Sequence, residues 1–239
     1  MKDDEALNVL YKVLKDNNIE PNNVMIQRFE NYYSYLVEYN QNVNLTAITE
    51  RCAVYLKHFA DSAVFSSAYN VGAHVCDIGT GAGFPGVVLK IIRPDLKLTL
   101  VDSLNKRITF LNELIVRLGL TDVTCLHYRA EDIEFKEKYL NSFDYVIARA
   151  VASMPTLTEY CLPYVKVGGQ FIAYKSGNVN TELNQAKKCI EILGGKFNRC
   201  ENYNVNNEIA RTIVVIDKYN KTSAKYPRGQ NKPRLKPIL

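Results

Sequence analysis

The segment that decides the fold reads Cys76-Asp77-Ile78-Gly79-Thr80-Gly81-Ala82-Gly83-Phe84-Pro85-Gly86 and is called the glycine loop below. A short apolar run leads into it, and a helical pattern follows it. The three glycines at 79, 81 and 83 let the backbone turn sharply and approach a ligand closely. Pro85 suits the first turn of a helix. A glycine-rich turn between a strand and a helix N-terminus is typical of a nucleotide-binding α/β domain.

Alternating strands and helices continue beyond the glycine loop. The residues predict strands at 75–78, 96–102, 123–127, 143–148 and 170–174, and helices at 85–92, 106–118, 155–164 and 180–193. Repeated strand–helix–strand units indicate a parallel sheet with right-handed crossovers. Two final strands, at 196–204 and 210–218, are joined by too few residues for a parallel return, so we expect an antiparallel hairpin. The sequence therefore predicts an α/β, Rossmann-like domain at residues 71–218.

Two segments flank this predicted domain. Apolar residues at helical spacing predict two helices within residues 3–40 and a third at 51–66, so residues 1–70 form a helical extension. Residues 219–239 contain three of the eight prolines and few apolar side chains. We therefore expect the C-terminal residues to form an extended basic arm.

Positive charge is concentrated at the C-terminus. The net charge is +5, but residues 218–239 carry seven basic and no acidic side chains, so the other 217 residues sum to −2. A concentrated basic segment indicates a polyanionic partner. We expect contacts with an RNA backbone from five side chains of the arm: Lys225, Arg228, Lys232, Arg234 and Lys236.

Composition excludes several classes of protein. The chain is 47% hydrophobic and 23% charged, which is ordinary for a globular domain, and its apolar runs are too short to cross a membrane. The start Met1-Lys2-Asp3-Asp4-Glu5 is too acidic for a signal peptide. The six cysteines form no C-x-x-C pair, so neither a metal site nor a disulfide framework is expected. We expect a cytoplasmic monomer with no membrane partner.

Two ligands compete for the glycine loop. The spacing Gly81-x-Gly83-x-x-Gly86 fits the dinucleotide fingerprint, in which a pyrophosphate lies at the helix N-terminus. Asp102, at the end of the next predicted strand, can hold a ribose in either case. Asp77 favours S-adenosylmethionine, because its carboxylate would repel a pyrophosphate but can orient the loop or meet the methionine ammonium.

Two further patterns favour the same ligand. The third predicted strand ends in Arg129-Ala130-Glu131-Asp132, and methyltransferases commonly place a polar residue there against the adenine edge. An antiparallel hairpin after the parallel strands is also the methyltransferase pattern. The residues therefore favour a class I S-adenosylmethionine-dependent methyltransferase over a dehydrogenase.

Several motifs together resemble the glucose-inhibited division B family. They are residues 77–86, 101–103, 129–131 and 148–151, supported by 44–46, 58, 61–62, 174–177 and 226–228. Those proteins are guanine-N7 methyltransferases of small-subunit ribosomal RNA. The resemblance spans nearly the whole chain and implies S-adenosylmethionine as cofactor and 16S ribosomal RNA, or the small ribosomal subunit, as partner. It also implies cofactor contacts at Gly79, Phe84, Ala130, Glu131 and Arg149.

The end of the fourth predicted strand agrees with an N7 target. Residues 148–155 read Ala-Arg-Ala-Val-Ala-Ser-Met-Pro, with neither the N/D-P-P-aromatic motif of amine methyltransferases nor a cysteine nucleophile. Guanine N7 has a free lone pair and no proton to lose, so alignment with the methyl group is enough. Arg149 is the candidate catalytic residue, because a side chain at the carboxyl end of a strand faces the ligand crevice. It would brace the cofactor or donate to guanine O6, and the alternative is a surface ion pair with Glu131 or Asp132.

Other interpretations stay open at this stage. An NAD(P)-dependent oxidoreductase lacks a convincing hydride-transfer constellation, since the pair Tyr11 and Lys15 precedes the glycine loop. A non-catalytic ribosome-binding module with a vestigial pocket is a third possibility. His58 and Asp61 fit either helix packing or a substrate-side role, and Lys175 fits either a phosphate contact or a solvated side chain.

Overall fold

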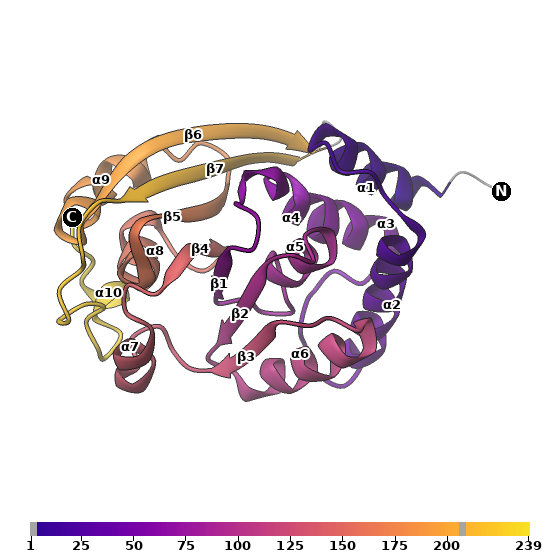
Figure 1. Ribbon diagram of the computed structural model, residues 1–239, viewed down its shortest axis with the longest axis horizontal. Helices are drawn as coiled ribbons and strands as arrows, with labels where there is room; N and C mark the ends of the chain where they lie inside the picture. The colour runs from indigo at the N-terminus through magenta and orange to yellow at the C-terminus, as the bar shows by residue number, and fades with distance from the viewer. Residues whose placement is uncertain (1–3, 206–208) are drawn as a thin grey trace.

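One sheet organises the chain. The computed structural model describes residues 4–205 and 209–239, and within them seven strands form a sheet in the order β3-β2-β1-β4-β5-β7-β6 (Figure 1). The strands are β1 (His74–Ile78), β2 (Lys97–Asp102), β3 (Val123–His127), β4 (Phe143–Arg149), β5 (Val165–Ser176), β6 (Gly195–Val205) and β7 (Ile209–Lys218). Strands β1 to β5 are parallel, and β7 is antiparallel to both β5 and β6. The predicted parallel sheet and antiparallel hairpin are confirmed, although the connector at 206–208 lies outside the described residues.

The strand order reverses between β1 and β4. From β1 the chain steps outward through β2 to β3 and then returns to pair β4 with the other edge of β1. In open α/β sheets, ligands bind in the crevice beyond the carboxyl ends of the strands at such a reversal. This topology places the glycine loop, which follows β1, next to Arg149, which ends β4.

Helices cover both faces of the sheet (Figure 1). One face carries the N-terminal helices together with the two that follow β1 and β2: α1 (Glu5–Asp16), α2 (Asn23–Asn40), α3 (Arg51–Val54), α4 (Asp61–Ala63), α5 (Gly86–Ile92) and α6 (Asn105–Leu118). The other face carries α7 (Ile133–Tyr139), α8 (Met154–Cys161) and α9 (Asn180–Ile192). The short helix α7 was not predicted, because its seven residues are too few for a clear apolar period. Across residues 4–205 and 209–239, no helix is both long and apolar enough to span a bilayer.

Each face of the sheet has its own apolar core. Side chains of β4 alternate between them, with Ile147 in the core that contains Phe29 and Phe59 and Val146 in the core beneath α8. The helical extension therefore packs into the same core as the sheet. The predicted helix at 51–66 is interrupted, since a π-helical turn at Tyr55–Ala60 separates α3 from α4.

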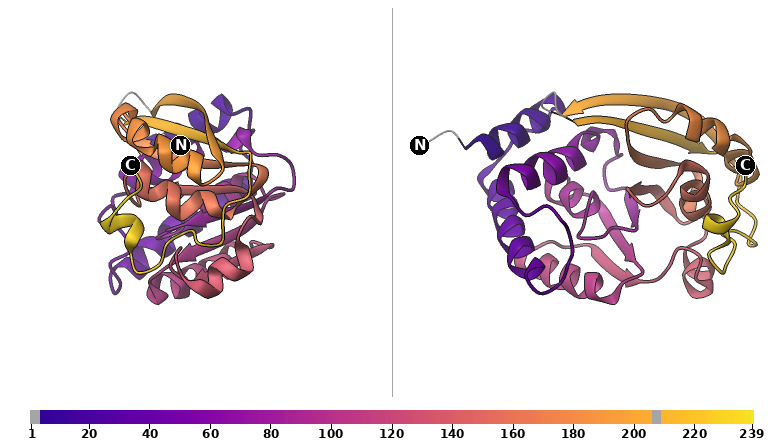
Figure 2. Two further views of the ribbon diagram at one scale, coloured as in Figure 1. Left: turned by 90° about the vertical axis from the view of Figure 1, so that its left-hand side faces the viewer. Right: turned by 180° about the vertical axis from the view of Figure 1, so that it is seen from behind.

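The C-terminal segment, residues 219–239, differs from the extended arm that the sequence predicted. It folds back beside α8 and includes the short helix α10 (Lys232–Leu235), as both views of Figure 2 show. Arg228 forms an ion pair with Glu159, whose carboxylate is fully buried in α8. A buried carboxylate needs a paired cation, so this contact ties the segment to the domain.

Candidate functional site

The glycine loop wraps over the end of β1 and is held by the backbone of β2. The amides of Gly79 and Thr80 donate to the Val101 carbonyl at 2.8 and 3.1 Å. Gly79 has a φ of +73°, and a Cβ there would lie 2.7 Å from Cγ2 of Val151. Only glycine fits this position, because any side chain meets both backbone strain and a neighbouring atom.

The Asp77 side chain binds the glycine loop through hydrogen bonds. Its buried carboxylate accepts hydrogen bonds from the Thr80 hydroxyl at 2.8 Å and the Gly86 amide at 2.9 Å, while its other oxygen has no partner among the described residues. Burial raises the pKa of Asp77 to about 7. The side chain is fully buried and does not line the cavity above the loop. Of its two predicted roles, this placement supports orientation of the loop.

Asp102 joins the end of β2 to the same loop. Its carboxylate accepts from the amides of Gly81 and Leu104 at 2.9 and 3.0 Å and pairs with Arg107 at 3.1 Å. The carboxylate is therefore fixed in orientation before any ligand arrives.

A first cavity of about 480 Å³, the cofactor cavity, lies beyond the ends of β1 to β4. Four of the six predicted cofactor residues line it: Gly79, Asp102, Ala130 and Glu131. The other two, Phe84 and Arg149, do not line this cavity. Three features of this cavity fit a ligand with a ribose and a purine, as S-adenosylmethionine has. They are the glycine loop, which leaves no room for a Cβ at Gly79, the fixed carboxylate of Asp102 and the polar end of β3.

A second cavity of about 320 Å³, called the acceptor cavity below for the role proposed for it, adjoins the first at Ala150, which lines both. Its lining comes from distant parts of the chain and includes six charged or polar side chains besides Tyr174 and Ser176: Lys57, His58, Asp61, Arg149, Lys175 and Arg211. The structure thus brings together the residues whose roles the sequence left open.

Asp61 is the centre of the acceptor cavity's charge network. Its fully buried carboxylate pairs with Arg149 at 2.7 Å and with Arg211 at 2.5 Å. The ion pair of Arg149 is therefore made with Asp61 and not with Glu131 or Asp132. Arg211 was not predicted as a site residue, because the sequence of a strand does not indicate which helix a single arginine in it will face.

Phe84 and His58 lie beside the Arg149 side chain. The Arg149 guanidinium lies 5.2 Å from the centre of the Phe84 ring, and the His58 ring stacks on Phe84 with centroids 4.5 Å apart. Burial, assisted by the charge of Arg149, lowers the pKa of His58 to about 4. The imidazole is therefore neutral near pH 7, and its Nε2 lies 3.0 Å from the Thr46 hydroxyl.

Lys175 is not a freely solvated side chain. Its ammonium donates to the Ala152 carbonyl at 3.0 Å and pairs with Glu182 at 2.8 Å. Glu182 also accepts from the Met154 amide at the start of α8. Lys175 therefore braces the loop after β4 on the edge of the acceptor cavity.

Residues 25–211 match the GidB family, described as rRNA small subunit methyltransferase G. The chain is 48% identical to a ribosomal RNA small subunit methyltransferase G of Lactobacillus acidophilus, over 94% of this chain and 96% of that protein. It is 47% identical to the protein of that name from Staphylococcus epidermidis, over 96% and 97%.

A solved structure shows the same fold. The crystal structure of M. jannaschii TYW2 in complex with AdoMet aligns with a TM-score of 0.55 at 14% identity, covering 66% of this chain and 74% of that one. At this identity the likeness extends to the fold alone.

Proposed function

The chain belongs to the rRNA small subunit methyltransferase G family, and from this premise we propose that it transfers the methyl group of S-adenosylmethionine to N7 of a guanine in 16S ribosomal RNA. The chain is an S-adenosylmethionine-dependent methyltransferase with a class I, Rossmann-like fold. The single observation that carries the assignment of sites is that Ala150 lines two adjoining cavities. A donor and an acceptor of a methyl group must touch, and this wall is where they would meet.

The first cavity is assigned to the cofactor, which when bound supplies an electrophilic methyl group on a sulfonium. The glycine loop gives backbone room for the ligand, and the fixed Asp102 carboxylate suits ribose hydroxyls. Ala130 and Glu131 lie at the end of β3, where the purine edge is expected. These residues bind and orient, and they need no change of protonation to do so.

The second cavity is assigned to the target guanine. Arg149, held by Asp61, is placed to donate to guanine O6 beside N7, which leaves the N7 lone pair free. The end of β4 borders both cavities, so the cofactor contact that the family resemblance implies for Arg149 stays part of the proposal. Methylation of N7 leaves positive charge on the purine, and the neutral His58 adds no further positive charge beside it. Alignment then provides most of the catalysis.

RNA contact is assigned to exposed cations of the C-terminal segment. Lys225, Lys232, Arg234 and Lys236 are exposed. Arg228 is paired with the buried carboxylate of Glu159, so we assign it to holding the segment on α8 in place of the phosphate contact that the sequence predicted. With a ribosomal RNA substrate, the reaction is expected in the bacterial cytoplasm.

Neither alternative function is favoured by the comparisons, because the family and the curated relatives are methyltransferases. The test is incubation with labelled S-adenosylmethionine and 16S ribosomal RNA from a strain that lacks the gene, followed by nucleoside analysis. Label in 7-methylguanosine is expected. Label in another nucleoside would overturn the N7 assignment, and no label would favour the non-catalytic module.

A further inference from the structure

One wall of the cofactor cavity comes from the C-terminal segment. Asn231 and Arg234 line the cavity together with Arg129, Ala130 and Glu131 at the end of β3. Asn231 also lines the neighbouring hollow, which Tyr128 and Glu131 border. Residues that follow the last strand of the sheet therefore reach the cavity. Figure 1 shows this yellow segment, with α10, near α8 and α7.

This wall is anchored at several points. The Thr156 hydroxyl donates to the Pro233 carbonyl at 2.9 Å, and the Tyr160 hydroxyl donates to the Asn231 side chain at 3.1 Å. Asn231 has a φ of +56°, a left-handed turn that asparagine tolerates better than most residues. With the Arg228–Glu159 ion pair just before it, the turn fixes where α10 lies against α8.

Arg234 has a charge that the protein itself does not neutralise. Within residues 4–205 and 209–239, Arg234 forms no ion pair with a carboxylate. Tyr160 and Glu131 line the same cavity as Arg234, so the guanidinium faces the space beside the end of β3. A planar guanidinium at a cavity wall can stack on a purine or donate to its ring nitrogens.

We propose that Asn231 and Arg234 form the adenine-side wall of the S-adenosylmethionine site, with Arg234 binding the purine directly. This inference rests on the proposed function, since it takes the first cavity as the cofactor site. It makes the C-terminal segment part of cofactor binding and reassigns Arg234 from RNA contact to the cofactor, while the exposed lysines of the segment keep their RNA assignment.

Calorimetric titration of the full-length Arg234→Ala protein with S-adenosylhomocysteine tests the proposal. A stacked or donating guanidinium predicts an affinity loss of roughly 3- to 30-fold. Lys232→Ala is the matched control, because Lys232 is exposed in the same short helix but does not line the cavity. It should leave the affinity within twofold. Arg234 is exposed, so thermal unfolding should be unchanged in both variants.

A second ligand locates the contact within the cofactor. The loss should be the same for 5′-methylthioadenosine, which has the adenosine but lacks the amino acid. Equal affinities for wild type and Arg234→Ala would overturn the inference while leaving the proposed function standing. A loss with S-adenosylhomocysteine alone would overturn the adenine-side assignment. Failure of the wild-type protein to bind either ligand would instead overturn the proposed function.

Discussion

The two cavities that meet at Ala150 are built in different ways. The cofactor cavity is built around the backbone of the glycine loop, and the Asp102 carboxylate beside the loop accepts hydrogen bonds from amides only 2 and 21 residues away. The acceptor cavity is held by side chains, with Asp61 joined to partners 88 and 150 residues away. A backbone-built site is damaged by adding atoms, whereas a site held by ion pairs is damaged by removing them.

The largest effect is expected from adding atoms to the cofactor cavity. Gly79→Val should lower the affinity for S-adenosylhomocysteine by roughly 100-fold or more, because strain at positive φ adds to overlap with Val151. Gly119→Val is the control, since Gly119 has a φ of +59° but open space around it. Calorimetry would measure both. Equal affinities for the two variants would show that the glycine loop is not the cofactor cradle, and tight NAD binding by wild type would argue for a dehydrogenase.

Removing atoms from the acceptor cavity should act on the reaction rate. Arg149→Ala should slow methyl transfer on the order of 10²-fold, because the target guanine loses the hydrogen-bond donor that aligns it. Single-turnover assays with saturating cofactor would measure the rate, and near-ultraviolet circular dichroism would check the fold. Arg199→Ala removes an arginine whose ion pair with Glu201 lies at the surface, and it should keep the wild-type rate. Wild-type turnover by Arg149→Ala would leave Arg149 with a purely structural ion pair.

The pH dependence of stability should reveal Asp77 beneath the loop. Its pKa is about 7 in the folded protein against an ordinary 3.8, so the folded state holds this proton to higher pH than the unfolded state. Its contribution to the unfolding free energy therefore falls as pH rises from about 4 to 7, with a slope approaching about 1.4 kcal/mol per pH unit. Asp77→Asn should remove that slope in urea unfolding series.

A carboxylate with the opposite shift gives the control for Asp77. Arg93 lowers the pKa of Asp95 to about 2. The contribution of the Asp95 carboxylate to the unfolding free energy is therefore complete above about pH 4 and is lost only as pH falls toward 2. Asp95→Asn should leave the slope between pH 4 and 7 as it is in wild type. An unchanged slope in Asp77→Asn would mean that this carboxylate is ionised throughout.

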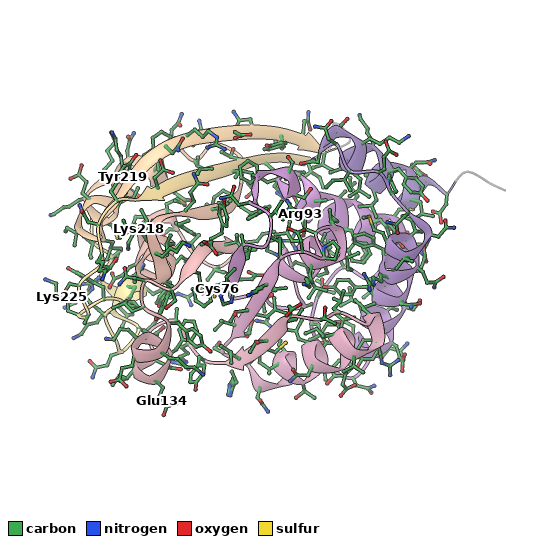
Figure 3. All side chains as sticks on the ribbon, in the orientation of Figure 1. Cys76, Arg93, Glu134, Lys218, Tyr219 and Lys225 are labelled. Atoms are coloured by element: carbon green, nitrogen blue, oxygen red, sulfur yellow. The ribbon has the colours of Figure 1, made fainter. Side chains whose placement is uncertain are left out.

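The smallest effect is expected at the outer surface. Lys225, which Figure 3 shows at the periphery of the C-terminal segment, and Lys236 are exposed. Changing both to glutamine should weaken RNA binding and shrink the slope of log affinity against log salt by roughly one unit for each phosphate that is no longer neutralised. The same change at Lys12 and Lys15 of α1 is the control. Identical slopes for both double variants would remove the C-terminal lysines from the RNA interface.

Much of the fold could be predicted from the sequence, because its signals are local. The strand and helix patterns and the glycine loop each depend on residues within one element or one turn. The parallel arrangement followed from the repeated strand–helix–strand units, and the antiparallel hairpin followed from its short connector. Four of the residues predicted to bind the cofactor line one cavity for the same reason, since the carboxyl ends of parallel strands lie at one edge of a sheet.

Tertiary structure alone decided which distant charges would meet. Nothing near Arg149 in the sequence indicates Asp61, and nothing near Arg228 indicates Glu159, 69 residues earlier. Burial supplies the reason: a carboxylate removed from water must find a cation, and the fold determines which one is within reach. The sequence by itself thus determined the sheet, the glycine loop and the family of chemistry. Packing determined that the helical extension completes the acceptor cavity and that the C-terminal segment closes on α8, because those contacts exist only once remote parts of the chain share a buried surface.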